Sequence, residues 1–276
     1  MKCDFWVQEP CDIILLAGQS NAVGIGVGEV TEEIADNPDI LLFYDTQFEG
    51  YKKDANGKDY LAVREPFVYA VKVMSEQNQS SNIALSFAKE YVKEGQLQAG
   101  RKLLIVRSAV GGTGFFKREW TEDGILFHRM RDMLQTALAM HKENRVVALC
   151  WHQGESDAFE CPDMENATER KNAYEAHFEK FIREVRKMCG NEKLPVMTGG
   201  FTQEWTRNFQ PQCDAVIAAT QSVCKRLGSA RFHSTEGLLS NNEKTSNGDD
   251  IHFCRESLHI LGKRYYQSFV DILGER

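Results

Sequence analysis

Short apolar runs, each followed by glycine or by polar residues, recur along the chain. A continuous apolar run of about four to eight residues is typical of a strand that is buried on both faces of a sheet. Several runs have this form, and residues 40–44 make a further possible strand within a turn-rich stretch. The predicted strands span residues 13–17, 103–106, 146–151 and 195–198.

Apolar residues at helical spacing lie between these runs. The clearest case is the stretch 168–189, where apolar residues recur every three or four positions from Tyr174 to Val185. Gly190 follows at the place where a helix would be expected to stop. Similar spacing predicts further helices at residues 83–92, 126–139 and 258–272.

Strands and helices therefore alternate, which predicts an α/β domain of right-handed βαβ units around a parallel sheet. Two stretches lack a regular pattern: residues 24–64 are turn-rich, and residues 155–166 are interpreted as an acidic loop directly after the third strand. Long loops in compact α/β domains often carry function. No repeat, low-complexity tract or linker divides the chain, so residues 1–276 are predicted to form one domain.

The composition is that of a globular protein with an acidic balance. Of 276 residues, 42% are hydrophobic and 26% are charged. The 33 basic and 40 acidic residues give a formal charge of −7. An acidic chain has no electrostatic reason to favour nucleic acid or an anionic membrane, so neither is an expected partner.

The N-terminal residues and the cysteines bear on location and on cofactors. The first apolar run, at residues 13–17, is too short and too far along the chain for a signal peptide or a membrane span, which predicts a cytoplasmic protein. The eight cysteines show no CxxC spacing, and free thiols fit a reducing compartment. No HExxH, GxxxxGK[ST] or GxGxxG motif occurs, so no metal or nucleotide cofactor is expected.

Chemically active residue types follow the predicted strands. Ser20 follows the first strand, the glycines of 111–114 follow the second, and a carboxamide with two carboxylates follows the third within 152–157. Asp249 and His252 lie just before the closing helix. Because ligands of α/β sheets bind at the carboxyl ends of the strands, we expect these groups to meet. A hydroxyl, glycine amides, a carboxamide, carboxylates and a histidine are the parts of an acyl-transfer site.

Four sequence blocks, taken in order, resemble those of the SGNH (GDSL-like) hydrolase superfamily. They resemble most closely its sialate O-acetylesterase and acetyl xylan esterase branch, carbohydrate esterase family six. The resemblance implies a three-layer flavodoxin-like fold with a central parallel sheet, and serine esterase chemistry without a metal. The blocks are Gly18-Gln19-Ser20-Asn21, Gly111-Gly112-Thr113, Trp151-His152-Gln153-Gly154-Glu155-Ser156-Asp157 and Asp249-x-x-His252-Phe253.

Carried over by position, the resemblance makes Ser20 the nucleophile and His252 the general base. Asp249 is the expected orienting carboxylate, and Glu155 and Asp250 are the alternatives. A serine hydroxyl is a weak nucleophile until a histidine takes its proton, and that imidazole needs a carboxylate to fix its tautomer. Asp249 and His252 can pair at little ordering cost because they share one short loop, whereas Glu155 lies in a strand-end loop that faces the same site.

The same resemblance implies an oxyanion hole. The oxyanion donors would be the Ser20 amide, a glycine amide at Gly111 or Gly112, and the side-chain amide of Gln153. Glycines let backbone amides approach closely, and a carboxamide adds another donor. Candidate substrate contacts are Asn21, Phe115 and Trp120. The structural alternatives for Asn21 are bracing of the nucleophile loop and capping of the next helix, and the alternative for the two aromatic side chains is core packing.

The expected function is removal of O-acetyl groups from a carbohydrate through an acetyl-enzyme. The expected partner is a small acetylated sugar, such as an acetylated xylo-oligosaccharide or a sialic acid, and surface aromatic residues leave a homo-oligomer open. One alternative is a broader SGNH esterase or thioesterase that acts on non-sugar acyl groups. The other is a catalytically silent carbohydrate-binding protein on the same fold.

Overall fold

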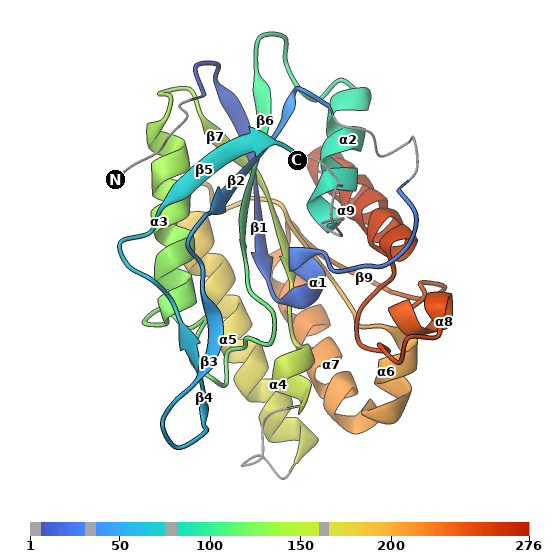
Figure 1. Ribbon diagram of the computed structural model, residues 1–276. Coiled ribbons are helices and arrows are strands. Elements are labelled where there is room, and N and C mark those ends of the chain that lie inside the picture. Colours follow the sequence, from blue (N-terminus) through green and yellow to red (C-terminus); the bar gives the residue numbers. More distant parts are fainter. Residues whose placement is uncertain (1–6, 31–36, 75–81, 160–165, 276) are drawn as a thin grey trace.

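A mixed sheet of seven strands forms the centre of the molecule (Figure 1). The computed structural model describes residues 7–30, 37–74, 82–159 and 166–275. The strand order is β5-β2-β6-β1-β7-β8-β9, and every neighbouring pair is parallel except β2 and β5. The strands are β1 (Cys11–Gly18), β2 (Ile40–Asp45), β5 (Tyr69–Val73), β6 (Lys102–Ala109), β7 (Arg145–His152), β8 (Val196–Gly199) and β9 (Ala230–His233).

Helices cover both faces of this sheet and make a three-layer α/β fold. Successive residues of β1 point to opposite faces, so Ile13 and Leu15 join one core cluster, and Ile14 and Leu16 join the other. One face packs against α3 (Ile125–Ala139), α5 (Ala167–Met188) and α7 (Gln210–Leu227), and the other against α2 (Ile83–Lys93) and α9 (Arg255–Gly274). The predicted fold class is confirmed, with an antiparallel edge strand added at β5.

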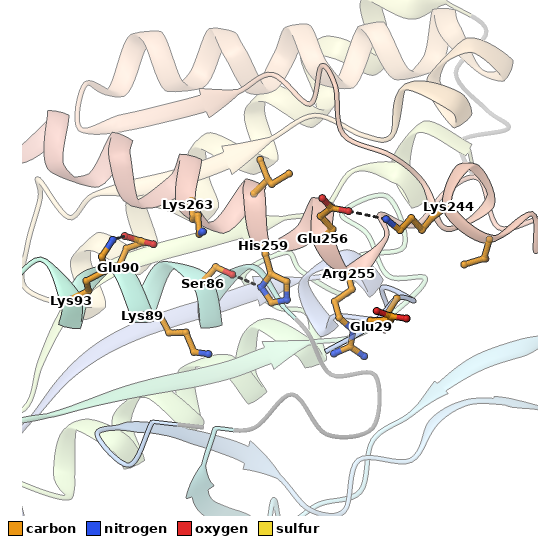
Figure 2. A pocket seen from close by; sticks show the side chains of 13 residues that line it. Glu29, Ser86, Lys89, Glu90, Lys93, Lys244, Arg255, Glu256, His259 and Lys263 are labelled. Carbon is orange, nitrogen blue, oxygen red and sulfur yellow. Dashed lines mark hydrogen bonds and ion pairs between the residues drawn. The ribbon is translucent and has the colours of Figure 1, made fainter. Parts of the chain in front are cut away.

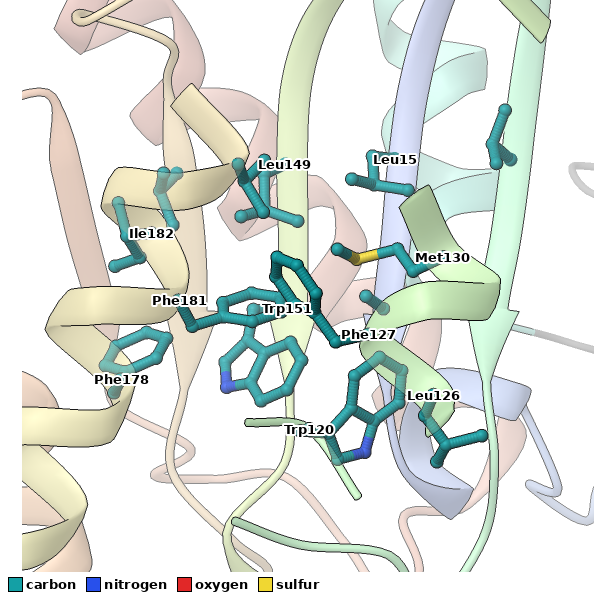
Figure 3. Close-up of a cluster of buried hydrophobic side chains, with 14 of the residues drawn as sticks. Leu15, Trp120, Leu126, Phe127, Met130, Leu149, Trp151, Phe178, Phe181 and Ile182 are labelled. Atoms are coloured by element: carbon teal, nitrogen blue, oxygen red, sulfur yellow. The ribbon is translucent and has the colours of Figure 1, made fainter. Parts of the chain in front are cut away.

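The larger core cluster is rich in aromatic side chains (Figure 3). The Trp151 ring lies 4.3 Å from the ring of Phe181 and 5.3 Å, edge to face, from that of Trp120. Phe115 stacks on Trp151 at 5.6 Å. Phe115 is 1% exposed and Trp120 is fully buried. Both residues that the sequence offered as sugar contacts pack in this core, and both also line a cavity of about 560 Å³.

Two stretches without a regular pattern contain structure that the sequence analysis missed. The prediction of an acidic loop at 155–166 was wrong for its first residues, which form α4 (Glu155–Phe159), while residues 160–165 lie outside the described residues. The turn-rich stretch 24–64 contains a hairpin of β3 (Gly50–Lys53) and β4 (Asp59–Ala62), which forms a separate two-stranded sheet. The short helices not predicted are α1 (Ser20–Val23), α6 (Gln203–Asn208) and α8 (Asn241–Thr245).

A buried carboxylate ties the amino end of β1 to its neighbours. Asp12 has no exposed surface and accepts hydrogen bonds from Arg101 Nε at 2.9 Å and Arg145 Nε at 2.7 Å on one oxygen. The Tyr91 hydroxyl donates to its other oxygen at 2.8 Å. A buried charge is tolerated only when it is paired and hydrogen-bonded, and Asp12 meets both conditions.

Candidate active site

The three central strands end level with one another. Gly18 of β1 pairs with Ala109 of β6 on one side and with His152 of β7 on the other. Gly18 has φ +135, and a Cβ at this position would lie 2.0 Å from the His152 carbonyl oxygen. Only glycine permits this close approach. The segments after β1, β6 and β7 therefore start side by side at the carboxyl edge of the sheet, where ligands of such sheets bind.

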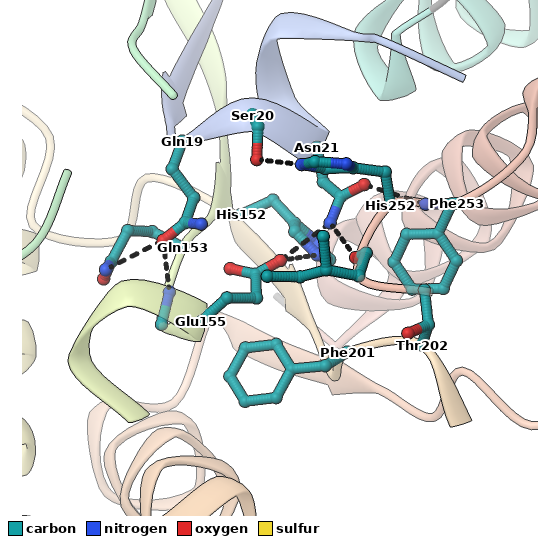
Figure 4. A network of polar contacts seen from close by, with 12 residues as sticks. Gln19, Ser20, Asn21, His152, Gln153, Glu155, Phe201, Thr202, His252 and Phe253 are labelled. Carbon is teal, nitrogen blue, oxygen red and sulfur yellow. Dashed lines mark hydrogen bonds and ion pairs between the residues drawn. The ribbon is translucent and has the colours of Figure 1, made fainter. Parts of the chain in front are cut away.

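Ser20, His252 and Asp249 lie in a hydrogen-bonded row at this edge. Ser20 is the first residue of α1, and its Oγ lies 2.8 Å from Nε2 of His252 (Figure 4). His252 Nδ1 lies 2.7 Å from Asp249 Oδ1. The loop between α8 and α9 carries both residues, and Asn241 of α8 anchors it by donating to Asp249 Oδ2 at 2.8 Å. The structure thus brings the three residues together, although Ser20 and His252 are 232 positions apart in the chain.

The other two carboxylates that the sequence offered make contacts elsewhere. Asp250 accepts a hydrogen bond from Asn208 of α6 at 3.0 Å. Glu155 is fully buried, and its Oε1 accepts from Asn21 Nδ2 at 2.7 Å. Among the described contacts, Asp249 is the only one of the three carboxylates that meets the His252 ring.

Two backbone amides at the carboxyl edge of the sheet have no protein acceptor among the described residues. The N–H groups of Ser20 and Gly111 have no hydrogen-bond acceptor among the residues that the structure describes. Gly111 lies against Ser20, since a Cβ on Gly111 would sit 3.5 Å from the serine Cβ. Gly112 has φ +71 and faces Tyr51 of the β3–β4 hairpin instead.

Gln153 lies at the same edge but is held in an internal network. Its Nε2 contacts Asp157 Oδ2 at 2.9 Å, the Thr113 carbonyl at 3.1 Å and Gln19 Oε1 at 3.3 Å. The side chain is 3% exposed, and Tyr174 donates to its Oε1 at 3.1 Å. Both amide hydrogens of Gln153 thus already face protein acceptors, and donation to an oxyanion would require it to release one.

Asp157 and Tyr51 support the site, although neither was assigned a specific role from the sequence. Asp157 accepts the N–H groups of Phe115 and Phe116 at 3.0 and 2.9 Å, which fixes the loop after β6, and burial raises its pKa to about 6. Tyr51 donates to the Gly112 carbonyl at 3.1 Å from the hairpin, about sixty positions earlier in the chain. Asp157 stood inside a recognised block, but nothing in the turn-rich stretch marked Tyr51.

His152 and Glu155 form a buried pair beneath the site. The Glu155 carboxylate oxygen Oε1 lies 3.8 Å from His152 Nε2, and His152 Nδ1 lies 3.1 Å from the Tyr265 hydroxyl. Burial lowers the pKa of His152 to about 3 and raises the pKa of Glu155 to about 7. His152 therefore faces away from Gln153 and packs in the interior, as the alternation of side chains along a strand predicts.

Two further features of the described residues bear on this edge: possible metal ligands, and a cavity between α2 and α9. No group of three or more His, Cys, Asp or Glu side chains that could hold a metal occurs among the described residues. A cavity of about 950 Å³ lies between α2 and α9 and is lined by charged residues such as Lys89, Arg255 and Lys263 (Figure 2). Neither Ser20 nor His252 lines it, so the chemistry and the cavity belong to different parts of the molecule.

The chain belongs to the carbohydrate esterase family of sialic acid-specific acetylesterases, whose family model matches residues 10–271. Membership makes it an ester hydrolase of the carbohydrate acetylesterase class. No curated protein matches the sequence. Within the described residues, no helix is both long enough and apolar enough to cross a membrane.

Solved structures share the fold at low sequence identity. NanS superimposes with a TM-score of 0.72 at 17% identity, over 97% of this chain and 99% of that one. A protein of Arabidopsis thaliana gives 0.67 at 20% identity, over 95% and 98%. A carbohydrate acetylesterase from Xanthomonas citri gives 0.63 at 17% identity, over 96% of this chain and 57% of that one. These likenesses show that the chain shares its fold with the three proteins.

Proposed function

We propose that the protein is a serine esterase that removes O-acetyl groups from a carbohydrate with Ser20, His252 and Asp249 as its catalytic triad. The observation that carries the proposal is the row of contacts from Ser20 Oγ to His252 Nε2 at 2.8 Å and from His252 Nδ1 to Asp249 at 2.7 Å. Both distances are within the range of hydrogen bonds between a nucleophile, its base and the carboxylate that orients the base.

In the first half of the reaction, Ser20 Oγ attacks the acetyl carbonyl carbon while His252 Nε2 takes the hydroxyl proton. Asp249 accepts a hydrogen bond from the Nδ1–H group, which holds the ring in the required tautomer and stabilises the imidazolium. The sugar hydroxyl then leaves with the proton from His252. In the second half, His252 activates a water molecule, which attacks the acetyl-enzyme, and acetate departs as Ser20 regains its proton.

The negative oxygen of the tetrahedral intermediate would be bound by the N–H groups of Ser20 and Gly111. Both lack a protein acceptor among the described residues, and Gly111 lies against the Ser20 side chain. Preorganised donors of this kind are each worth about 10²–10³ in rate. Gln153 contributes chiefly by holding the loops together, because its amide hydrogens already contact Asp157 and Thr113.

The substrate class rests on the family and not on a sugar pocket. The family model is that of a sialic acid-specific acetylesterase, which favours an acetylated sialic acid over an acetylated xylo-oligosaccharide as the first substrate to try. We place the reaction in the cytoplasm on small soluble sugars.

The first experiment measures acetate release from a panel of acetylated sialic acids, xylo-oligosaccharides and other sugars. Wild-type protein should release acetate, and Ser20→Ala should lose essentially all of this activity because no nucleophile remains. The absence of release from any sugar, or undiminished release by Ser20→Ala, would overturn the proposal. A rate that peaks with long-chain acyl esters would point to the broader esterase class.

The same assay identifies the orienting carboxylate through Asp249→Asn. Leaving a triad histidine in the wrong tautomer can lower kcat by up to about 10⁴-fold. Asp250→Asn is the matched control, because it changes the neighbouring carboxylate, which contacts Asn208 and not His252. Equal losses in the two variants would rule out Asp249 as the specific partner of His252.

A further inference from the structure

Ser20 stands between two carboxamide side chains, and each one ties it to a different loop. On one side, Gln19 Oε1 accepts the N–H groups of Ser156 at 3.2 Å and Gly154 at 3.4 Å, which joins the Ser20 segment to the turn after β7. On the other side, the Asn21 side chain reaches the loop that carries His252 (Figure 4).

Asn21 holds the backbone on both sides of His252. Its Oδ1 accepts the N–H of Phe253 at 3.0 Å, and its Nδ2 donates to the carbonyl of Ile251 at 3.2 Å. The side chain has no exposed surface. Because Asn21 is bonded directly to Ser20, these contacts fix the histidine backbone relative to the serine backbone. An amide can do this because it donates and accepts at the same end, which neither a carboxylate nor an apolar side chain can do.

Glu155 completes the hydrogen bonding of Asn21. The second proton of Asn21 Nδ2 goes to Glu155 Oε1 at 2.7 Å, from the start of α4. Without this acceptor, one N–H of a fully buried amide would be left without a partner, and an unsatisfied buried polar group costs about 1–3 kcal/mol. Glu155 lies two contacts away from the reacting atoms, since Asn21 and the backbone of residues 251–253 stand between it and the His252 ring.

We propose that Asn21 is a positioning residue that holds His252 against Ser20, and that Glu155 acts through Asn21 and not on the His252 ring. This inference rests on the proposed function, because it concerns the geometry of the proposed nucleophile and base. It also replaces substrate binding as the role of Asn21, whose polar atoms are all directed at the protein.

The first test compares Asn21→Ala with Asn144→Ala in the hydrolysis of 4-nitrophenyl acetate. Asn144 is the matched control: its side chain also bridges two backbone groups, Cys11 N–H at 2.6 Å and the Ala137 carbonyl at 2.7 Å, but at the amino edge of the sheet. Asn21→Ala should lower kcat by roughly 10- to 100-fold with little change in KM, because a misplacement of about 1 Å costs up to about 10²-fold. Equal kcat values in the two variants would overturn the positioning role.

A second set of variants tests whether Glu155 acts through Asn21. Glu155→Gln keeps an acceptor oxygen and should retain a kcat close to that of the wild type, whereas Glu155→Leu should lose about as much as Asn21→Ala. The double variant Asn21→Ala/Glu155→Leu should lose no more than Asn21→Ala alone, because both changes break one unit. If Glu155→Gln lost as much kcat as Asp249→Asn, Glu155 would itself orient His252, and this part of the proposal would fail.

Hydrogen exchange at the Phe253 amide tests the contact without reference to activity. This N–H should exchange faster in Asn21→Ala than in the wild type, and it should be unchanged in Asn144→Ala. Faster exchange in Asn21→Ala, together with a wild-type protein that has no esterase activity, would overturn the proposed function but not the contact of Asn21 with the His252 loop. Unchanged exchange in Asn21→Ala of an active enzyme would overturn that contact but not the proposed function. If Asn21→Ala does not fold, Asn21→Leu, which has a similar volume but neither accepts nor donates a hydrogen bond, provides the same comparison.

Discussion

At the residue scale, the position of Ser20 is set by the buried side chains on either side of it in the chain. Gln19 and Asn21 are both buried, yet between them they hold the turn after β7 and the loop of His252. The sequence presented the segment 18–21 as one motif, but it assigned a role only to the serine and left Asn21 between a ligand contact and a brace. The reason is that a side-chain amide has the same formula in either role, and only its partners distinguish them.

Residue type alone does not show the partners of a side chain, and this explains which other residues at the site could be predicted from the sequence. That Ser20, His252 and Asp249 lie together was predictable, because they stand at a strand end or before a helix on the same edge of the sheet. Tyr51 was not predictable: its contact with the Gly112 carbonyl depends on how a polar hairpin folds back over the sheet edge. Phe115 and Trp120 pack in the core, and their residue type could not decide between a core and a sugar site, because a large aromatic ring serves both.

The raised pKa of Glu155 predicts a pH-dependent contribution to stability. Burial moves this pKa from 4.5 to about 7, so between these pH values the folded protein keeps a proton that the unfolded chain has released. The folded state then binds more protons, and the stability from this group falls as the pH rises through that window. Glu155→Gln cannot titrate and should raise the melting temperature relative to the wild type at pH 8 more than at pH 5.

Thermal unfolding of the two proteins at both pH values measures this effect. Burial also raises the pKa of Asp157 and lowers that of His152, and both residues are present in both proteins. Glu192→Gln, at an exposed position, is the control and should show no pH-dependent difference. A melting difference for Glu155→Gln that is the same at pH 5 and pH 8 would contradict the assignment.

At the scale of elements, strands and helices with strong patterns were predictable and those with weak patterns were not. The central strands β1, β6 and β7 and the helices α5 and α9 were predicted to within a few residues. Helix α7 was missed because the side chains that it buries are mostly small or weakly apolar, including Cys213, Ala215, Ala219 and Thr220. Strand β9 was missed because it has only four residues, two of which are Arg231 and His233.

The buried charge network of Asp12 lies at the amino end of β1, whereas the Ser20 segment follows its carboxyl end, so we expect changes at Asp12 to affect stability and not kinetics. Asp12 lies about 20 Å from Gly18 along the strand. Removing one partner of a buried charge network costs about 3–5 kcal/mol, so Asp12→Ala should lower the free energy of unfolding by about that amount. The kcat and KM of the folded variant should stay at wild-type values, since the Ser20 segment is untouched.

Urea unfolding together with esterase kinetics below the transition checks this separation. Asp59→Ala serves as the control, because it removes the partner of an exposed ion pair with Lys53 and should change stability by less than about 1 kcal/mol. A loss of kcat in folded Asp12→Ala would mean that the two ends of the strand are coupled.

At the scale of the whole molecule, the proposed site draws on segments from both ends of the chain. The sheet interleaves them as well, because β1 lies between β6 and β7. This arrangement supports the prediction of one domain. The chain should therefore unfold in a single cooperative transition, in which esterase activity, helix content and aromatic fluorescence are lost at the same temperature. Loss of activity in an earlier, separate transition would contradict a single folding unit.

The β3–β4 hairpin is separate from the central sheet, which makes it a suitable segment to replace in enzyme engineering. It forms its own small sheet, and Tyr51 joins it to the Gly112 carbonyl beside the serine, whereas the contacts that fix Ser20, His252 and Asp249 come from other segments. The hairpin can therefore be altered without removing the contacts of the Ser20–His252–Asp249 row. A library that grafts hairpins of different length and composition between β2 and β5 would vary the contact at Gly112 while the residues of that row are retained.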